Sequence, residues 1–216
     1  MVSLRHQDLK EEISALSCTP LDPTKMFSLY VAVGFWSTYA VDLLSVASTD
    51  GHFEPVCNSI SLPALPRSLL LHDFGNAPHL LVGLRDGTLV AFTFAKNELQ
   101  DKRVFSLGTE PVGLTQFEMG ENNVVFASGS RAALFYLERG ILQHSSILIK
   151  VNVTSRVRLP RSVLPCEQSV FASARINSEI WLSSLLLMTS TGCVVGTVQD
   201  LDKMHIRTVS SSPNGF

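Results

Sequence analysis

Charged side chains are scarce in this sequence. Asp, Glu, Lys and Arg make up 17% of it, where a typical globular protein has about 25%. The formal net charge is only −2, so no long-range field concentrates nucleic acid around the chain. The densest basic stretch, SRVRLPRS, holds Arg156, Arg158 and Arg161 without an interleaved aromatic residue that would stack a base. We interpret this stretch as a solvated loop.

Paired cysteines and long apolar runs are also missing. Cys18, Cys57, Cys166 and Cys193 lie far apart, with no C-x-x-C pair. This spacing is typical neither of a zinc site nor of a disulfide framework, and it favours buried thiols in a reducing compartment, the cytosol or the nucleus. The N-terminal segment is charged, and no apolar run reaches about 18 residues, so we expect neither a signal peptide nor a membrane span.

No motif for catalysis or cofactor binding occurs. The G-x-G-x-x-G, P-loop, H-E-x-x-H and G-x-S-x-G patterns are absent, and the six histidines show no metal-ligand spacing. His72 and Asp73 form the one adjacent pair of imidazole and acid. Neighbours on a strand point to opposite faces, so we expect this pair to have a loop or edge role rather than a catalytic one. The sequence predicts no enzyme, no cofactor and no metal site.

What the sequence does contain is one recurring pattern: an apolar strand, a turn of small residues, and a second strand rich in β-branched or aromatic residues. It predicts hairpins. The four copies are LYVAVGFWSTYAVDLLSV, HLLVGLRDGTLVAFTF, NVVFASGSRAALFYL and LLLMTSTGCVVGTV. In the second copy, Asp86 and Gly87 suit a type I′ turn, while Gly192 and Gly129 supply the glycines of the fourth and third copies.

The spacing of the hairpins favours a β-propeller. Taking Gly34, Gly83, Ala127 and Met188 as equivalent points, the intervals are 49, 44 and 61 residues. Further short strands are expected between the hairpins, at EISALSC, RSLLLHDF, PVGLTQFEM and SSILIKVNV. A period in the forties with four strands is typical of a propeller blade. A β-sandwich is the alternative, but it gives no reason for the same hairpin to recur at these intervals. We predict an all-β, partial β-propeller of about four blades.

The end of the chain raises a question about completeness. The segment KMHIRTV, residues 203–209, reads either as an ordinary edge strand or as a strand that leads to a further part of the fold. Propellers commonly have more blades than these four, and an open arc leaves two sheet faces uncovered. We therefore predict an incomplete propeller over residues 1–209 and a polar tail over residues 210–216.

Trp36 stands directly after Gly34 and Phe35 at a hairpin turn. A core tryptophan is less expected at such a turn, and an exposed aromatic residue can anchor a partner. From the residues alone, blade packing and an interface remain equal alternatives for Trp36.

Several segments between Leu9 and Val209 carry a family resemblance. They are EISALSCTPLD with LYVAVGFWST, LPRSLLLHDF with HLLVGLRDGTLVAFTF, LGTEPVGL with NVVFASGSRAALFY and, most specifically, GTVQDLDKMHIRTV. These segments resemble the family of the large damaged-DNA-binding protein subunit 1, the three-propeller adaptors of cullin-4 ubiquitin ligases. The resemblance is weak at residues 45–60 and 140–180. Paralogous splicing-factor and polyadenylation-factor subunits share the architecture, so a scaffold for RNA processing is the alternative.

The resemblance implies that the chain corresponds to the later blades of the second propeller, the one that docks the cullin. KMHIRTV would then be the exit segment toward the third propeller. Two positions match family residues on the cullin-facing edge: Glu12, for which a solvated surface acid is an equal alternative, and Trp36, for which the resemblance favours the interface. The implied partners are a cullin-4-type scaffold and the other propellers of the full-length adaptor. Substrate receptors would be reached only through absent regions, and nucleic acid at most indirectly. The implied roles are in DNA repair and protein ubiquitination, in the nucleus and the cytoplasm.

Overall fold

A computed structural model of the chain describes residues 9, 11–22, 24–46, 52–75, 77–119, 122–147, 169–176, 184–190, 192–200 and 203–208. Every regular element in these ranges is a β-strand, and the strands form four antiparallel sheets that follow one another along the chain. Arg156, Arg158, Arg161 and the tail 210–216 lie outside the described residues, so our interpretations of them stay predictions.

Each sheet is built from consecutive strands in the order of the chain. The first sheet holds β1 (Ile13–Ser17), β2 (Tyr30–Phe35), β3 (Ala40–Ser45), β4 (Glu54–Pro55) and β5 (Ile60–Ser61), of which β4 and β5 both pair with β3. The second sheet holds β6 (Pro66–Asp73), β7 (Pro78–Leu84), β8 (Thr88–Ala95) and β9 (Glu98–Ser106). The third sheet holds β10 (Gly113–Met119), β11 (Asn122–Ser128), β12 (Ala133–Glu138) and β13 (Ile141–Ser146). The fourth sheet holds β14 (Val170–Ile176), β15 (Ser184–Thr189), β16 (Gly192–Asp200) and β17 (Lys203–Thr208).

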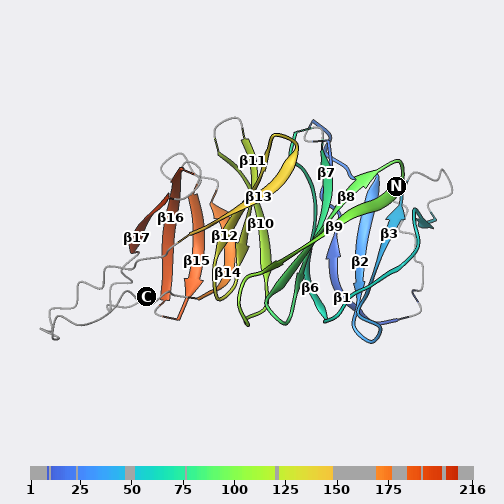
Figure 1. The fold of residues 1–216 in the computed structure, drawn as a ribbon, viewed down its shortest axis with the longest axis horizontal. Coiled ribbons are helices and arrows are strands. Elements are labelled where there is room, and N and C mark those ends of the chain that lie inside the picture. The colour runs from blue at the N-terminus through green and yellow to red at the C-terminus, as the bar shows by residue number, and fades with distance from the viewer. Residues whose placement is uncertain are drawn as a thin grey trace, which may run out of the picture.

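The four sheets stand in a series, each packed against the next (Figure 1). Their first strands contact one another in turn: β1 contacts β6, β6 contacts β10, and β10 contacts β14. First strands that line a common centre, with the later strands further out, are the arrangement of propeller blades. The predicted all-β, partial β-propeller of about four four-stranded blades is therefore confirmed.

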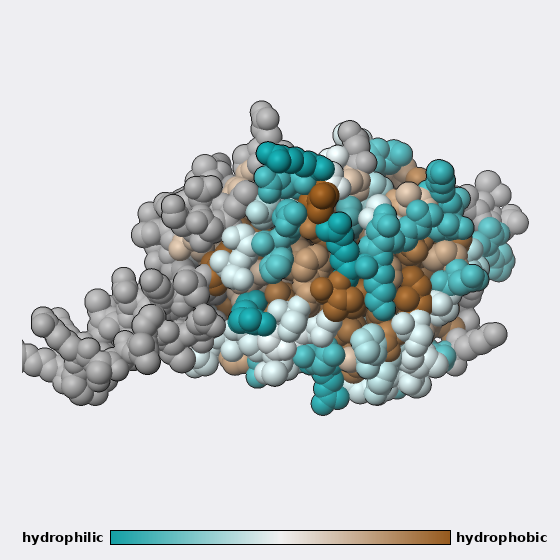
Figure 2. Space-filling model, in the orientation of Figure 1, coloured by the Kyte–Doolittle hydropathy of each residue, from teal (hydrophilic) through white to brown (hydrophobic). Residues whose placement is uncertain are grey.

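The core consists of apolar side chains between adjacent sheets. Leu80 of the second sheet packs toward the first, whereas its neighbour Leu81 packs toward the third. Phe126 of the third sheet packs with Leu187 of the fourth. Because the middle sheets are covered on both faces, the central parts of their second strands, Leu80–Val82 of β7 and Val124–Ala127 of β11, are runs of buried apolar residues rather than alternating ones. On the side shown in Figure 2, hydrophilic residues cover much of the described surface, and hydrophobic ones show as patches between them.

The strand register changes one of the four residues that we took as equivalent between the hairpins, Gly34, Gly83, Ala127 and Met188. Gly34 and Gly83 both face the following sheet, because an added Cβ would meet Pro66 and Val112, respectively. Ala127 packs toward the preceding sheet instead. Its neighbour Ser128 pairs with the inner strand β10 as Gly83 pairs with β6, so Ser128 is the true equivalent. The hairpins therefore still repeat along the chain, with Ser128 in place of Ala127 as the equivalent residue of the third hairpin.

The turn in the second hairpin also differs from the prediction. A type I′ turn needs positive φ at two residues, but in the β7–β8 turn only Gly87 has it, at +85°. The side chain of Asp86 caps the turn, because its Oδ1 accepts a hydrogen bond from the Thr88 backbone N–H at 3.0 Å. The connection is a three-residue turn, and the type I′ prediction is wrong.

Other expectations meet mixed outcomes. KMHIRTV contains β17, which pairs with β16 at the outer edge of the fourth sheet, as an edge strand should. The strand predicted at SSILIKVNV is only partly correct, because β13 begins at Ile141 and ends at Ser146. Residues 148–153 of that prediction lie outside the described residues. Cys18 and Cys193 are exposed free thiols, so the prediction of buried cysteines is wrong for both. In the described part of the chain, no helix is long and apolar enough to cross a membrane.

Candidate functional site

Glu12 and Trp36 lie side by side at one end of the first sheet. The backbone N–H of Trp36 donates a hydrogen bond to the backbone carbonyl oxygen of Glu12, with an N···O distance of 2.9 Å. This bond continues the β1–β2 pairing just beyond the pair of Ile13 and Phe35. The structure thus brings the two predicted residues together on one edge. Whether they bind a partner stays a prediction.

Three large apolar side chains are exposed around this edge. Trp36 is 44% exposed, Tyr39 42% and Ile13 48%. Tyr39 closes the β2–β3 turn with a φ of +55°, a conformation that few aromatic residues adopt. The hydroxyl of Thr38 in the same turn donates to Oε2 of Glu11 at 2.8 Å and so ties the turn to the start of β1. We call Glu12, Ile13, Trp36 and Tyr39 the tryptophan edge.

The tryptophan edge has the composition of a docking surface rather than of a catalytic site. Aromatic residues are enriched among the residues that contribute most to protein binding, and half-exposed ones lose water on contact. Glu11 and Glu12 add negative charge beside them. The edge offers apolar area with an acidic border, which suits a partner with apolar and basic groups.

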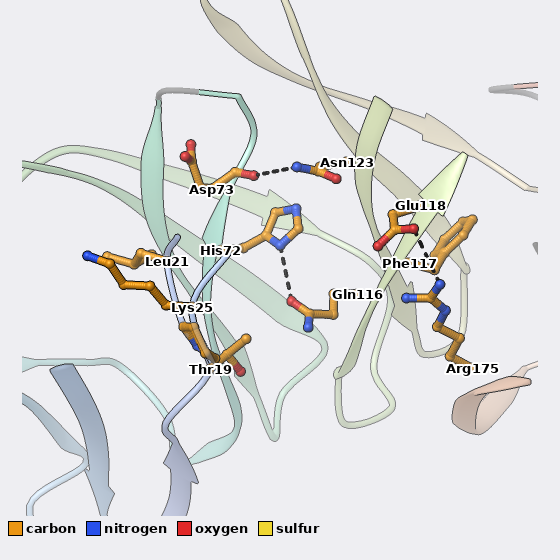
Figure 3. A pocket seen from close by; sticks show the side chains of 11 residues that line it. Thr19, Leu21, Lys25, His72, Asp73, Gln116, Phe117, Glu118, Asn123 and Arg175 are labelled. Carbon is orange, nitrogen blue, oxygen red and sulfur yellow. Dashed lines mark hydrogen bonds and ion pairs between the residues drawn. The ribbon is translucent and has the colours of Figure 1, made fainter. Parts of the chain in front are cut away.

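A cavity of about 250 Å³ lies at the other end of the sheets, where β1, β6 and β10 end (Figure 3). Nδ1 of His72 lies 3.3 Å from Oε1 of Gln116. The Asn123 amide donates to the Asp73 carbonyl oxygen at 3.3 Å. The remaining described charges at this cavity include the ion pair of Arg175 with Glu118, 3.4 Å apart, and Lys25, which pairs with Asp22 at 3.5 Å.

His72 and Asp73 have separate roles at this cavity. His72 is buried on β6, the first strand in the order of its sheet, so it lies on an edge strand and not in a loop. Oδ1 of Asp73 accepts the Ala77 backbone N–H at 2.7 Å and stabilises the β6–β7 turn, while His72 faces Gln116. Burial lowers the pKa of His72, and burial likewise lowers that of His79. Both imidazole rings contact the Phe74 ring edge to face. Both imidazoles are therefore held neutral near pH 7.

Sequence reasoning missed several of these residues. Tyr39 was hidden within the hairpin pattern, although an aromatic residue next to a turn is itself a signal for an exposed anchor. Gln116, Asn123 and Arg175 come from three different strands, and only the fold brings them to one cavity. Among the described residues, no group of three or more His, Cys, Asp or Glu side chains is placed to hold a metal ion.

Comparison with known proteins gives consistent matches. The family model of the RSE1/DDB1/CPSF1 second beta-propeller matches residues 1–161. DNA damage-binding protein 1 of Drosophila melanogaster is 29% identical over 212 residues, which cover 96% of this chain and 17% of that protein. DNA damage-binding protein 1 of Oryza sativa subsp. japonica is 28% identical, over 97% of this chain and 17% of its own length. DNA damage-binding protein 1a of Arabidopsis thaliana is 26% identical, over 97% and 18%. The chain thus spans about a sixth of the length of these relatives.

Proposed function

The chain belongs to the family of RSE1/DDB1/CPSF1 second beta-propellers, and from that premise we propose that it is a non-enzymatic protein-docking module. Its partner is a cullin-4-type scaffold, which it links, as part of an adaptor with further propellers, to substrate receptors of a ubiquitin ligase. The relatives named DNA damage-binding protein 1 support a place in DNA repair. A role in protein ubiquitination and a location in the nucleus and the cytoplasm are part of the proposal and rest on the family resemblance of the sequence.

The single observation that carries the proposal is the tryptophan edge. Trp36 is half-exposed on a turn that is fixed by two hydrogen bonds, one through its own backbone N–H and one through the Thr38 hydroxyl. A rigid, exposed aromatic residue loses little conformational entropy on binding, so most of the free energy of its desolvation goes into affinity. Glu12, at the border, adds charge that steers the approach of a basic partner.

The proposal excludes a reaction carried out by the chain itself. At the 250 Å³ cavity, the side chains of Asp73, Glu118 and Arg175 are engaged with neighbouring groups of the chain. Among the described residues, the side-chain hydrogen-bond partner of His72 is the Gln116 amide, and not a hydroxyl or thiol that it could activate. A hydrolase activity that disappears in His72→Ala, in a folded variant, would overturn this part of the proposal.

The binding test is Trp36→Ala in the full chain, measured by calorimetric titration with the N-terminal domain of a cullin-4-type scaffold. We expect the binding free energy to weaken by about 2 kcal/mol, so that Kd rises about thirtyfold, because the variant removes a side chain that the interface would bury. Phe27→Ala is the matched control, since Phe27 is 61% exposed on the connection at the opposite end of β2. Unchanged affinity in a folded Trp36→Ala variant would contradict the assignment of the edge.

A pull-down separates this function from a scaffold role in RNA processing. The family model includes RSE1 and CPSF1 besides DDB1, while the relatives compared above are DNA damage-binding proteins. We expect a cullin among the proteins retained by the chain, and its loss with Trp36→Ala. Splicing or polyadenylation factors in place of the cullin would overturn the proposal in favour of the alternative.

A further inference from the structure

The second sheet carries an arginine at the position where the first sheet carries Trp36. The backbone N–H of Arg85 donates a hydrogen bond to the Leu65 carbonyl oxygen at 2.9 Å, just as the N–H of Trp36 donates to Glu12. In both sheets the donor follows the second strand directly, and the acceptor is the last residue before the first strand. Arg85 is therefore the structural counterpart of Trp36, one sheet further along the arc and at the same end of the strands.

A second arginine, Arg67, lies at the start of β6. The register between β6 and β7 shifts between Pro66 and Ser68, so Arg67 is the extra residue of a β-bulge. Pro66 contacts the first sheet, because a Cβ added to Gly34 would lie 3.0 Å from its ring. Ser68 contacts the third sheet, where its Oγ accepts the Leu114 backbone N–H at 3.1 Å. The bulge thus leaves Arg67 exposed between a residue that packs on one neighbouring sheet and a residue that packs on the other.

The two arginines adjoin each other and the tryptophan edge. Pro66 pairs with Leu84 in the strand register, and each arginine directly follows one member of this pair. The same proline lies against Gly34, two residues before Trp36. We call Arg67 and Arg85 the basic pair.

The basic pair has unused bonding capacity. Both side chains are exposed, and among the described residues neither guanidinium group has a hydrogen bond or an ion pair. Arg103 and Arg131, in contrast, donate to backbone carbonyl oxygens at 3.1 Å and 3.0 Å. The acid that follows Arg85 is Asp86, and its Oδ1 accepts the Thr88 N–H. The donors of the basic pair are therefore available to a partner.

The charge of Arg67 is not a requirement of the bulge. The first strands of the first and fourth sheets have the same register shift, and their extra residues are Ser14 and Phe171. Among these three bulges, the cation occurs on the sheet that packs beside the tryptophan edge. Bulges redirect side chains and often lie next to functional sites, which suits a charge presented to a partner.

We propose that the docking surface continues from Trp36 onto the second sheet, and that the basic pair binds an acidic side chain, aspartate or glutamate, of the same partner. This inference rests on the proposed docking function and names the chemistry of the partner. A guanidinium group can form two parallel hydrogen bonds with one carboxylate, so a pair of arginines gives a strong and directional contact. Because Glu11 and Glu12 belong to the first sheet, the surface carries both signs of charge. This fixes the orientation of a partner segment that has a basic group and an acidic group.

The basic pair is accessible whatever the number of blades. Turns between strands lie at the ends of the channel that propeller blades surround, whereas neighbouring blades pack on the faces of a sheet. Further sheets on either side of the arc would therefore leave this surface uncovered.

A nucleic-acid phosphate is the alternative anion for the basic pair. Tight binding to a phosphate backbone usually draws on more cations than two, and Glu11 and Glu12 beside the surface would repel it. An isolated carboxylate of a protein partner fits this mixture of charges better.

The test compares the double variant Arg67→Glu with Arg85→Glu to the unchanged protein, by calorimetric titration with the same cullin-4-type domain. Both residues are exposed, so the Tm should stay unchanged. We expect Kd to rise about tenfold or more and to depend less on salt, because two attractive charges become repulsive. The pair Arg67→Gln with Arg85→Gln, which only removes the attraction, should raise Kd less.

The matched control is Lys96→Glu with Lys102→Glu. It makes the same change of charge at exposed residues of the outer hairpin in the same sheet, and it should leave Kd unchanged. A short DNA duplex is the second probe, and we expect the unchanged chain not to bind it.

The outcomes separate this inference from the function on which it rests. Unchanged or tighter binding by the Arg67 and Arg85 variants, together with weakened binding in Trp36→Ala, would overturn the inference and leave the docking function standing. An equal rise of Kd in the lysine control would mean a general charge effect and would also overturn the inference. DNA binding that the arginine variants abolish, with unchanged affinity for the cullin-4-type domain, would overturn it in favour of a phosphate ligand. No binding of that domain by the unchanged chain would overturn both the inference and the docking function.

Discussion

The two sheets at the ends of the arc differ in how far their outer faces are buried. On the first sheet, Phe35 and Leu44 are buried beneath Leu9 and Phe53, so the chain covers this face with its own side chains. On the fourth sheet, Leu186 and Met188 are 39% and 51% exposed, and Phe171 beside them is 51% exposed. The outer face of the first sheet is thus buried by side chains of the chain itself, whereas that of the fourth sheet exposes apolar side chains.

The comparison shows that burial in this fold is decided by the neighbouring sheet and not by the residue. Gly34 and Gly83 are small because a following sheet approaches them closely, with Pro66 or Val112 against the position of a Cβ. Met188 occupies the equivalent place in the fourth sheet and is large and half-exposed. Where no described segment approaches, the constraint on size disappears.

The largest expected effect comes from two adjacent leucines on β15. Leu187 is fully buried against the third sheet, whereas Leu186 points to the open face. We expect Leu187→Ala to lower the free energy of unfolding by about 2–5 kcal/mol, the usual cost of such a cavity. Leu186→Ala should cost less than about 1 kcal/mol. Urea denaturation of both variants measures the difference, and equal losses would mean that the outer face of the fourth sheet is covered in solution.

A smaller effect is expected at the position shared by Gly83 and Met188. In Gly83→Ala the new methyl group would overlap the Val112 carbonyl oxygen, so the second and third sheets must move apart. We expect a loss of about 1–3 kcal/mol from this overpacking. Met188→Ala removes an exposed side chain and should change the free energy of unfolding by no more than about 0.5 kcal/mol. Thermal unfolding distinguishes them, and a harmless Gly83→Ala would contradict the close approach of the two sheets.

The smallest expected effect is on the pH dependence of stability, and it arises in the second sheet, in the middle of the arc. Burial lowers the pKa of His72 and of His79 in the folded state, so the unfolded chain binds more protons than the folded one below the ordinary histidine pKa of about 6.5. Stability is therefore complete above that pH and falls as the pH drops through the lowered values. Unfolding free energies between pH 8 and pH 5 should decline, and less steeply in His72→Gln. A decline that is the same in both proteins would place its origin in other groups.

The sequence predicted those parts of the fold in which a local pattern repeats. The four hairpins, and β6 and β10, were found because apolar runs ended at small-residue turns. β9 was missed, because ELQDKRVFS is an outer strand with exposed side chains and shows no alternation. β14 was missed because its mostly exposed segment VFASARI stands outside the four recognised hairpins.

The candidate site was predictable to a different extent. Glu12 and Trp36 came from the family resemblance, and the structure shows only that they adjoin each other. The burial of Cys18 and Cys193 was predicted wrongly, because the exposure of a cysteine depends on which segments pass over it and not on its spacing in the sequence.

The backbone bond between Glu12 and Trp36 has a consequence for how docking could be lost. Strand ends fray more readily than strand centres, and Glu12 is the residue immediately before β1. If the start of β1 peels away, the Trp36 amide loses its acceptor and the indole its fixed orientation, although no atom of the tryptophan side chain has changed. The hydrogen-exchange rate of the single Trp36 amide would then report how often the surface is competent to bind, and trimming by a protease just upstream of β1 would act as a switch.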